Sequence, residues 1–211
     1  PRPLIFGLGS SLNIDMPILS SGFVPSYNYY DDLYGRDRWK FSNVYSLSIG
    51  QGELLVTPLQ MANLAAIIAN RGIYYTPKIV IEIDGKKVMN QIRINTDIDI
   101  NHYNYIIDAM EDVVKLGSAR RGYMDDIILC GKTSTVQNPH GYDHSGFIGF
   151  APKEKPTIAI SSYIENAGQG GRAAVSIASL AVEYYINNGI KRKWLEEYVL
   201  LGDFIDEEDT E

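Results

Sequence analysis

Three consecutive stretches in the second half of the chain have the composition of β-strands, at residues 126–137, 143–151 and 156–164. Only short segments, residues 138–141 and 152–155, connect them. Parallel neighbours need a crossover of about a dozen residues or more, whereas antiparallel neighbours can be joined by a tight turn. The sequence therefore predicts an antiparallel meander, against which the rest of the chain has to pack.

A helix is predicted to begin at Pro58. Thr57 can cap the free backbone amides, Pro58 suits the first turn, and Gln60 completes a capping box. Gly72 can supply the left-handed turn that ends the helix. Apolar residues recur at helical spacing between these limits, which indicates one packing face. The predicted face consists of Met61, Leu64, Ala65 and Ile68.

Two further helices are predicted from the same periodicity, at about 100–116 and 172–188, with Gly117 and Gly189 as their stops. The predicted buried stripe of the first is Tyr103, Ile106, Ile107, Met110, Val113 and Val114. That of the second is Ile177, Leu180, Ala181, Tyr184 and Tyr185. Helices packed against an antiparallel sheet place the chain in the α+β class.

The remaining segments are less regular. Residues 1–50 are rich in Gly, Pro, Ser, Asn and Tyr and have little periodicity, which predicts irregular loops with one short helix. Residues 77–96 predict a short hairpin that turns at Asp84-Gly85.

Bulk properties exclude several functions. The net charge is −7, and without a basic stripe the chain is not expected to bind nucleic acid. A single cysteine, Cys130, excludes an intrachain disulfide and a Cys-rich metal site. No stretch approaches the ~20 apolar residues that span a bilayer. The chain begins with Pro1 rather than Met, so the lack of a signal peptide in it says nothing about the compartment.

The first strand carries the most evident chemistry. An ammonium and a hydroxyl on adjacent residues, Lys132 and Thr133, can bind a substrate carboxylate near an exposed edge. On such an edge, the backbone N–H of Thr135 is free to donate into an oxyanion hole. A solvent-facing Lys-Thr pair in an ordinary strand is the simpler interpretation of the tripeptide alone, since so short a motif is common by chance.

Longer motifs around this strand and upstream of it are more specific than the tripeptide. The run from Gly131 to Gly141, followed by Asp143-His144 and the Phe-Ile-Gly-Phe-Ala-Pro of residues 147–152, resembles class B penicillin-binding proteins of the penicillin-binding protein 2 type. A second segment resembles the same family, with Ser-Ile-Gly-Gln-Gly-Glu-Leu at 48–54 and Val-Thr-Pro-Leu-Gln-Met-Ala at 56–62. The upstream segments 6–9, 14–17 and 24–26 also fit, in the order that the family has them.

The resemblance implies a serine-acylating D,D-transpeptidase domain, the C-terminal portion of the serine β-lactamase and transpeptidase-like fold. Lys132 and Thr133 match the family residues that contact the carboxylate of the substrate or of a β-lactam. Thr135 matches the position whose amide helps to form the oxyanion hole. Ser134, in the same substrate-binding strand, stands where the family has glycine, and its hydroxymethyl group can narrow the groove or reorient the amide.

The family's nucleophile lies in a Ser-x-x-Lys box, and no lysine of this chain has a serine three residues before it. Two Ser-x-Asn matches, at 11–13 and 26–28, lie in segments that match the family downstream of its Ser-x-Asn box, so we interpret them as chance. We therefore expect residues 1–201 to be the C-terminal part of a transpeptidase domain and 202–211 to be a disordered acidic tail. With the nucleophile outside it, the chain alone is expected to be inactive.

For the parent protein, the resemblance implies cross-linking of peptidoglycan stem peptides through an acyl-serine intermediate, and binding of β-lactam antibiotics. It implies partners in the cell-elongation machinery and no cofactor or metal. It also implies an N-terminal anchor in the bacterial inner membrane, with the catalytic domain on the periplasmic side.

Two alternatives remain open from the sequence. A non-catalytic transpeptidase-like module that docks elongation-machinery partners is favoured by Ser134 and by the missing nucleophile. A serine β-lactamase shares the fold and the Lys-Thr-Gly type of strand. Two smaller features have structural interpretations: His140, Asp143 and His144 are expected to hold a turn by hydrogen bonds, and Cys130 to be a small buried packing residue.

Overall fold

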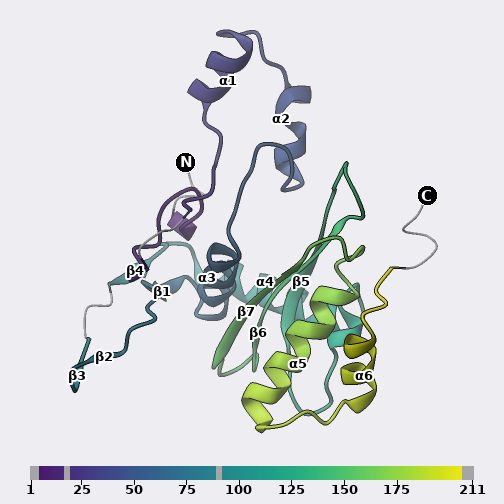
Figure 1. The fold of residues 1–211 in the computed structure, drawn as a ribbon. Helices are drawn as coiled ribbons and strands as arrows, with labels where there is room; N and C mark the ends of the chain where they lie inside the picture. Colours follow the sequence, from purple (N-terminus) through teal and green to yellow (C-terminus); the bar gives the residue numbers. More distant parts are fainter. Residues whose placement is uncertain (1–4, 17–19, 89–91, 206–211) are drawn as a thin grey trace.

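The computed structural model describes residues 5–16, 20–88 and 92–205 (Figure 1). The helices are α1 (Tyr27–Tyr34), α2 (Phe41–Ser48), α3 (Pro58–Ala69), α4 (Ile100–Lys115), the 3-10 turn η2 (Arg120–Gly122), α5 (Ala173–Asn187) and α6 (Lys193–Leu201). The strands are β1 (Ile73–Tyr75), β2 (Glu82–Ile83), β3 (Lys86–Lys87), β4 (Arg93–Asn95), β5 (Cys130–Val136), β6 (His144–Ala151) and β7 (Ile158–Ile164). Helices against an antiparallel sheet confirm the α+β class.

The central sheet has the order β5-β6-β7, and both pairs are antiparallel. Each strand lies inside one of the three stretches predicted from the sequence, so the predicted meander is confirmed. Opposite partners in the β5–β6 ladder include Thr133 with Phe147 and Ser134 with Gly146. Because β5 pairs only with β6 within the described residues, one of its edges carries no strand neighbour.

Helices lie on both faces of the sheet (Figure 1). On one face, Cys130 and Phe150 pack with Ala69 of α3 and Met110 of α4. On the other face, Phe147 packs against α5 as part of the larger core cluster. The buried members of that cluster are Val114, Ala119, Met124, Ile127, Leu129, Phe147, Ala151, Ala174, Val175, Ala178 and Val182. Alternation of side chains along each strand separates the two layers.

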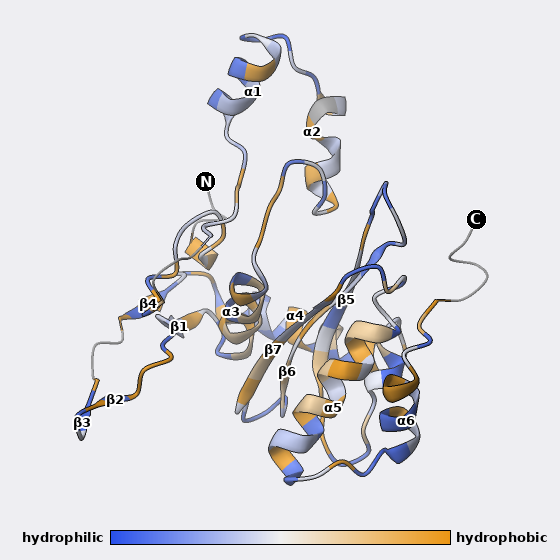
Figure 2. Cartoon of the chain, viewed as in Figure 1, coloured by the Kyte–Doolittle hydropathy of each residue, from blue (hydrophilic) through white to orange (hydrophobic). Residues whose placement is uncertain are grey.

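Helices α3 and α4 cover only part of the sheet face against which they pack. Lys132 and Ser134 follow Cys130 at two-residue intervals on this face, and both are exposed. Val136 at the end of β5 is 37% exposed, and Tyr163 of β7 is 42% exposed. Figure 2 shows β5 as a more hydrophilic strand than β7, which lies on the other side of β6. Part of the sheet near the end of β5 is therefore open to solvent.

The predicted start of α3 is confirmed in detail. Thr57 accepts from the backbone N–H of Gln60, and the Gln60 side chain accepts from the backbone N–H of Thr57. The buried positions of α3 are Gln60, Asn63, Ala65, Ile67 and Ala69. Of the predicted face, Ala65 is buried and Ile68 is partly buried against the core around Cys130 and Phe150, while Met61 and Leu64 are only partly buried. Buried Gln60 explains the shift, because its amide donates to the backbone carbonyls of Gly7, Ser10 and Ser21.

The buried face predicted for α4 agrees with the structure better than the face predicted for α5. In α4, Tyr103, Ile107, Met110 and Val114 are buried as predicted, while Ile106 is 46% exposed. Of the face predicted for α5, Leu180 is buried, but the prediction is wrong for Tyr184 and Tyr185, which are 61% and 57% exposed. The buried residues of α5 are Ala173, Ala174, Val175, Ser176, Ala178, Ser179, Leu180, Val182 and Glu183. Small side chains on this face let the helix approach the sheet more closely than tyrosines would.

Residues before α3 form two short helices rather than the one predicted. α1 and α2 lie on an arm that projects from the body (Figure 1), and a backbone bridge between Phe23 and Leu55 closes its base. Within the arm, buried Tyr30 donates to Glu53 at 2.9 Å. Burial, reinforced by Glu53, raises the pKa of Tyr30 to about 12.

The segment after α3 contains the predicted hairpin. β2 and β3 pair and turn at Asp84-Gly85, both of which have positive φ. A second antiparallel pair, β1 with β4, lies at its base and begins earlier than predicted, at Ile73.

The C-terminal end contains α6, which the sequence analysis did not predict. Leu195 of α6 is fully buried, and Gly202 ends the helix in the left-handed conformation. Of the predicted tail, residues 206–211 lie outside the described residues. Among the helices of the described ranges, none is both long and apolar enough to cross a membrane.

Candidate active site

The edge of β5 that faces away from β6 is the centre of the candidate site. Nζ of Lys132 donates to the carbonyl oxygen of Thr133 at 2.8 Å, so this carbonyl points away from the ladder with β6. Hydrogen-bonding groups of an antiparallel strand alternate between its two edges. Thr133 and Thr135 therefore both direct their backbone N–H and C=O groups to the free edge, which the Lys132 ammonium also reaches.

The hydroxyl of Thr133 has a partner from outside the sheet. Its Oγ1 lies 2.7 Å from Oγ of Ser118, in the connection between α4 and η2. Sequence reasoning missed Ser118, because a single serine in a loop has no periodic or motif signal. The ammonium of Lys132 and the hydroxyls of Thr133 and Ser118 thus lie close to one another. Such a set of donors is suited to a carboxylate.

Thr135 is held by the loop that precedes α5. Its Oγ1 accepts from the backbone N–H of Gly170 at 3.2 Å. Buried Ser145 fixes that loop to the sheet, because its hydroxyl donates to the carbonyl of Gln169 and accepts from the N–H of Ala174, both at 3.0 Å. A side chain at Gly170 would come within 2.2 Å of the Ser134 carbonyl, so only glycine allows this approach.

Ser134 occupies the position between these two threonines. Its side chain is exposed and lies on the same face of the sheet as Lys132. A Cβ atom added to Gly146, its cross-strand partner, would lie 2.1 Å from Oγ of Ser134. The hydroxymethyl group therefore leans over Gly146, toward β6.

A network of hydrogen bonds fixes the turn between β5 and β6. Asp143 accepts from the backbone N–H of Asn138 at 3.1 Å, and Nδ1 of His144 accepts from the N–H of Asn166 at 3.0 Å. The Asn138 amide donates to Asn166 at 2.7 Å. The structural role predicted for Asp143 and His144 is thus confirmed, while His140 contributes only its backbone N–H. No group of three or more His, Cys, Asp or Glu side chains in the described ranges is placed to hold a metal ion.

A cleft of about 650 Å³ lies beside the end of β5. One wall is the segment that leads back from the arm to α3, with Gly50, Gln51 and Gly52. The other wall is the end of β5 and its turn, from Val136 to Pro139. Two motifs separated by some 80 residues in the sequence therefore share one cleft. Their proximity could not be predicted, because it depends on the path of the arm.

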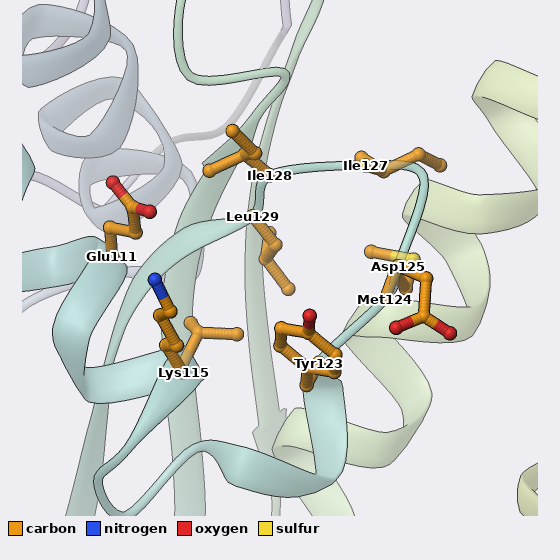
Figure 3. Close-up of a pocket in the computed structure, with 9 residues that line it drawn as sticks. Glu111, Lys115, Tyr123, Met124, Asp125, Ile127, Ile128 and Leu129 are labelled. Atoms are coloured by element: carbon orange, nitrogen blue, oxygen red, sulfur yellow. The ribbon is translucent and has the colours of Figure 1, made fainter.

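A smaller pocket, of about 190 Å³, lies near the start of β5. Figure 3 shows Glu111 and Lys115 on α4, and Ile128 and Leu129 on the segment that enters β5. Glu111 is already paired with Lys153 at 2.5 Å. Cys130 lies just beyond, fully buried as predicted, and burial raises the pKa of its thiol to about 12. We therefore assign no chemistry to this end of the strand.

Comparison with known proteins identifies the family of the chain. Residues 5–183 match the family described as the penicillin binding protein transpeptidase domain. The chain belongs to this family. It is 31% identical over 202 residues to a peptidoglycan D,D-transpeptidase MrdA of Acinetobacter baumannii, a match that covers 86% of this chain and 30% of that protein. A protein of the same name from Haemophilus influenzae is 27% identical, over 92% of this chain and 33% of its own length.

Solved structures of the family have the same fold. Pseudomonas aeruginosa PBP2 superposes with a TM-score of 0.75 and 26% identity, over 90% of this chain and 43% of that one. The family and its penicillin-binding protein 2 type, expected from the resemblance, are thus confirmed. The chain spans about a third of the length of the curated relatives that it matches.

Proposed function

We propose that this chain supplies one wall of the active site of a peptidoglycan D,D-transpeptidase. The observation that carries the proposal is the free edge of β5, where the Lys132 ammonium, the Thr133 hydroxyl and the Thr135 N–H are presented together. An edge strand of this kind can bind an extended peptide by strand addition, with the charged group fixing its register. Names of the relatives, which are peptidoglycan D,D-transpeptidases, support this choice of reaction.

In the proposed reaction, the donor is a stem peptide that ends in D-Ala-D-Ala. Lys132 and Thr133 bind its terminal carboxylate through charge-assisted hydrogen bonds. The hydroxyl oxygen of a serine outside this chain attacks the carbonyl carbon of the D-Ala-D-Ala bond, and the terminal D-Ala leaves as the amine. The Thr135 N–H stabilises the oxyanion of the tetrahedral intermediate. An amine from a neighbouring stem then attacks the acyl-serine and releases the serine.

β-Lactams would acylate the same serine, because they present a carboxylate and a reactive carbonyl to the same groups. Ser134, between the carboxylate-binding residues and the oxyanion-hole residue, would contact either ligand. The division into a transpeptidase part, residues 1–201, and an acidic tail, 202–211, belongs to the same proposal. The uncovered part of the sheet, around Lys132 and Val136, supports a second half of the domain that packs there and carries the nucleophile.

The relatives support a proposal about partners. A solved structure from Helicobacter pylori is a complex between PBP2 and MreC. We propose partners in the cell-elongation machinery for the parent of this chain. We also propose an N-terminal anchor in the bacterial inner membrane, with this domain on the periplasmic side.

A second candidate is a non-catalytic module of the same machinery. It is favoured by the absence of a Ser-x-x-Lys box from the sequence and by Ser134 in place of glycine. The groups presented at the free edge of β5 are the argument against it, since a module that only docks partners needs neither a carboxylate site nor an oxyanion donor.

Intact mass spectrometry after incubation with benzylpenicillin tests the proposal. We expect the chain alone to gain no mass, and the same chain extended upstream to include a Ser-x-x-Lys box to gain one penicilloyl group. A folded extended protein that gains no mass would overturn the enzymatic proposal and leave the non-catalytic module.

A further inference from the structure

Ser134 and Gly146 form a complementary pair across the β5–β6 ladder. They are direct partners in the register. A Cβ atom at Gly146 would lie 2.1 Å from Oγ of Ser134, while Cβ and the carbonyl oxygen of Ser134 would both remain at 3.5 Å, in ordinary contact. The Ser134 hydroxyl therefore occupies the space that any side chain at position 146 would need.

This orientation keeps the free edge of β5 accessible. The edge at which Thr133 and Thr135 present their backbone groups lies on the opposite side of the strand from β6. A side chain that leans over β6 adds no bulk to that edge. With a larger residue at position 146, the Ser134 side chain would have to rotate to another staggered position and could turn toward the edge.

The Ser134 hydroxyl is also free to interact. It is exposed, and it has no hydrogen-bond partner within the part of the chain that the structure describes. It lies on the same face as Lys132 and two residues along the strand, roughly 7 Å away. A ligand that places its carboxylate at Lys132 and then crosses β5 onto the sheet would meet this hydroxyl.

We propose that Ser134 is a specificity-determining residue for the donor ligand and that Gly146 is the positioning residue for its hydroxyl. The inference rests on the proposed function. The favoured ligand carries a compact polar group where it crosses β5, because that group can pair with the hydroxyl. A bulky apolar group at the same point would cover the hydroxyl without pairing it, which costs affinity.

A double-mutant cycle tests the pair in the parent protein that contains the nucleophile. The variants are Ser134→Gly, Gly146→Ala and the combination of both. Gly189→Ala is the matched control, since no atom lies within 4 Å of its added Cβ and it lies at the end of α5. Acylation rates are measured with two penicillins that share one acyl side chain and differ only in the substituents of the five-membered ring, which lies between the carboxylate and the reacting carbonyl. These substituents are compact and polar in one penicillin and bulky and apolar in the other.

We expect Ser134→Gly to shift the ratio of the two rates about tenfold toward the bulky penicillin. We expect Gly146→Ala to slow acylation by both about tenfold, through displacement of Ser134. The double variant, in which the added methyl group meets no hydroxyl, recovers the rates of Ser134→Gly. The control keeps the rates and the ratio of the unmodified protein.

Two results would overturn the inference while leaving the proposed function in place. One is a ratio of the two acylation rates that is the same in Ser134→Gly as in the unmodified protein. The other is a fall in the acylation rates on Gly146→Ala that is equally large whether residue 134 is serine or glycine. No acylation of any protein, including the unmodified one, would instead overturn the proposed function and this inference with it.

Discussion

The hydroxyl oxygens of Ser118 and Thr133 lie 2.7 Å apart and join the loop after α4 to the free edge of β5. Gly171 makes the approach of a second loop possible, because a Cβ there would lie 2.4 Å from the carbonyl oxygen of Ser118. The rotamer of Thr133 is thus set by a residue outside the sheet. The proposed carboxylate site therefore depends on the loop as well as on the strand.

The first prediction concerns this contact. Ser118→Ala should slow acylation of the nucleophile-containing parent about fivefold, the equivalent of one neutral hydrogen bond of about 1 kcal/mol. Thermal stability should hardly change, because Ser118 is exposed. Ser42→Ala, at an exposed serine on the arm, is the control. Equal rates for the two variants would show that Thr133 does not need Ser118.

The second prediction concerns the charge at the edge of β5. Lys132→Met should lower the acylation rate by roughly 10- to 100-fold, because a charge-assisted bond to the ligand carboxylate is lost. Raised salt should slow the unmodified protein and have little effect on the variant, since screening acts on the ammonium. Lys155→Met removes an exposed charge from the β6–β7 connection and should leave acylation unchanged. A salt response that survives in Lys132→Met would contradict this role.

The third prediction concerns stability. Buried Glu183 accepts hydrogen bonds from the backbone N–H of Lys191 at 2.9 Å and from Nε of Arg192 at 2.9 Å. Glu183→Ala leaves the guanidinium of Arg192, whose side chain is only 12% exposed, without its carboxylate partner. The free energy of unfolding should therefore fall by about 3–5 kcal/mol. Glu196→Ala, which breaks the exposed pair with Lys193, should cost less than about 1 kcal/mol. Denaturant titration of both variants compares them, and similar midpoints would refute the assignment.

The fourth prediction concerns pH. Burial raises the pKa of the Cys130 thiol from its ordinary 9.0 to about 12, so the folded state favours the neutral thiol. Its contribution to stability is present below pH 9 and is lost as pH rises from 9 to 12. Cys130→Ala should therefore lose less stability than the unmodified chain over that range. The pKa of Tyr30 is also raised to about 12. Its effect on stability is the same in both proteins, so it does not contribute to the difference between them. Alkylation of the folded chain at pH 8 should be slow, and rapid labelling would contradict the burial.

The sequence predicted those parts of the fold that depend on neighbours in the chain. The meander followed from short connections, and the start of α3 from the capping box of Thr57 and Gln60. Part of the face of α5 was predicted wrongly because periodicity favoured the large Tyr184 and Tyr185, whereas close packing on the sheet selected Ala174 and Ala178.

The candidate site shows the same limit. Lys132, Thr133 and Thr135 could be named because they lie within one motif. Ser118, Gly170 and the segment around Gln51 could not, because they reach β5 only through the tertiary fold. Nothing in a single sequence links Ser134 to Gly146 before the strand register is known.

The proposed function requires that the free edge of β5 binds the reacting ligand. A crystal structure of the nucleophile-containing parent, acylated by benzylpenicillin, tests it most directly. We expect the carbonyl oxygen of the acyl group to lie about 2.7–3.1 Å from the backbone nitrogen of Thr135. We also expect the ligand carboxylate to contact Lys132 and Thr133. An acyl group whose carbonyl oxygen and carboxylate both lie away from β5 would contradict it.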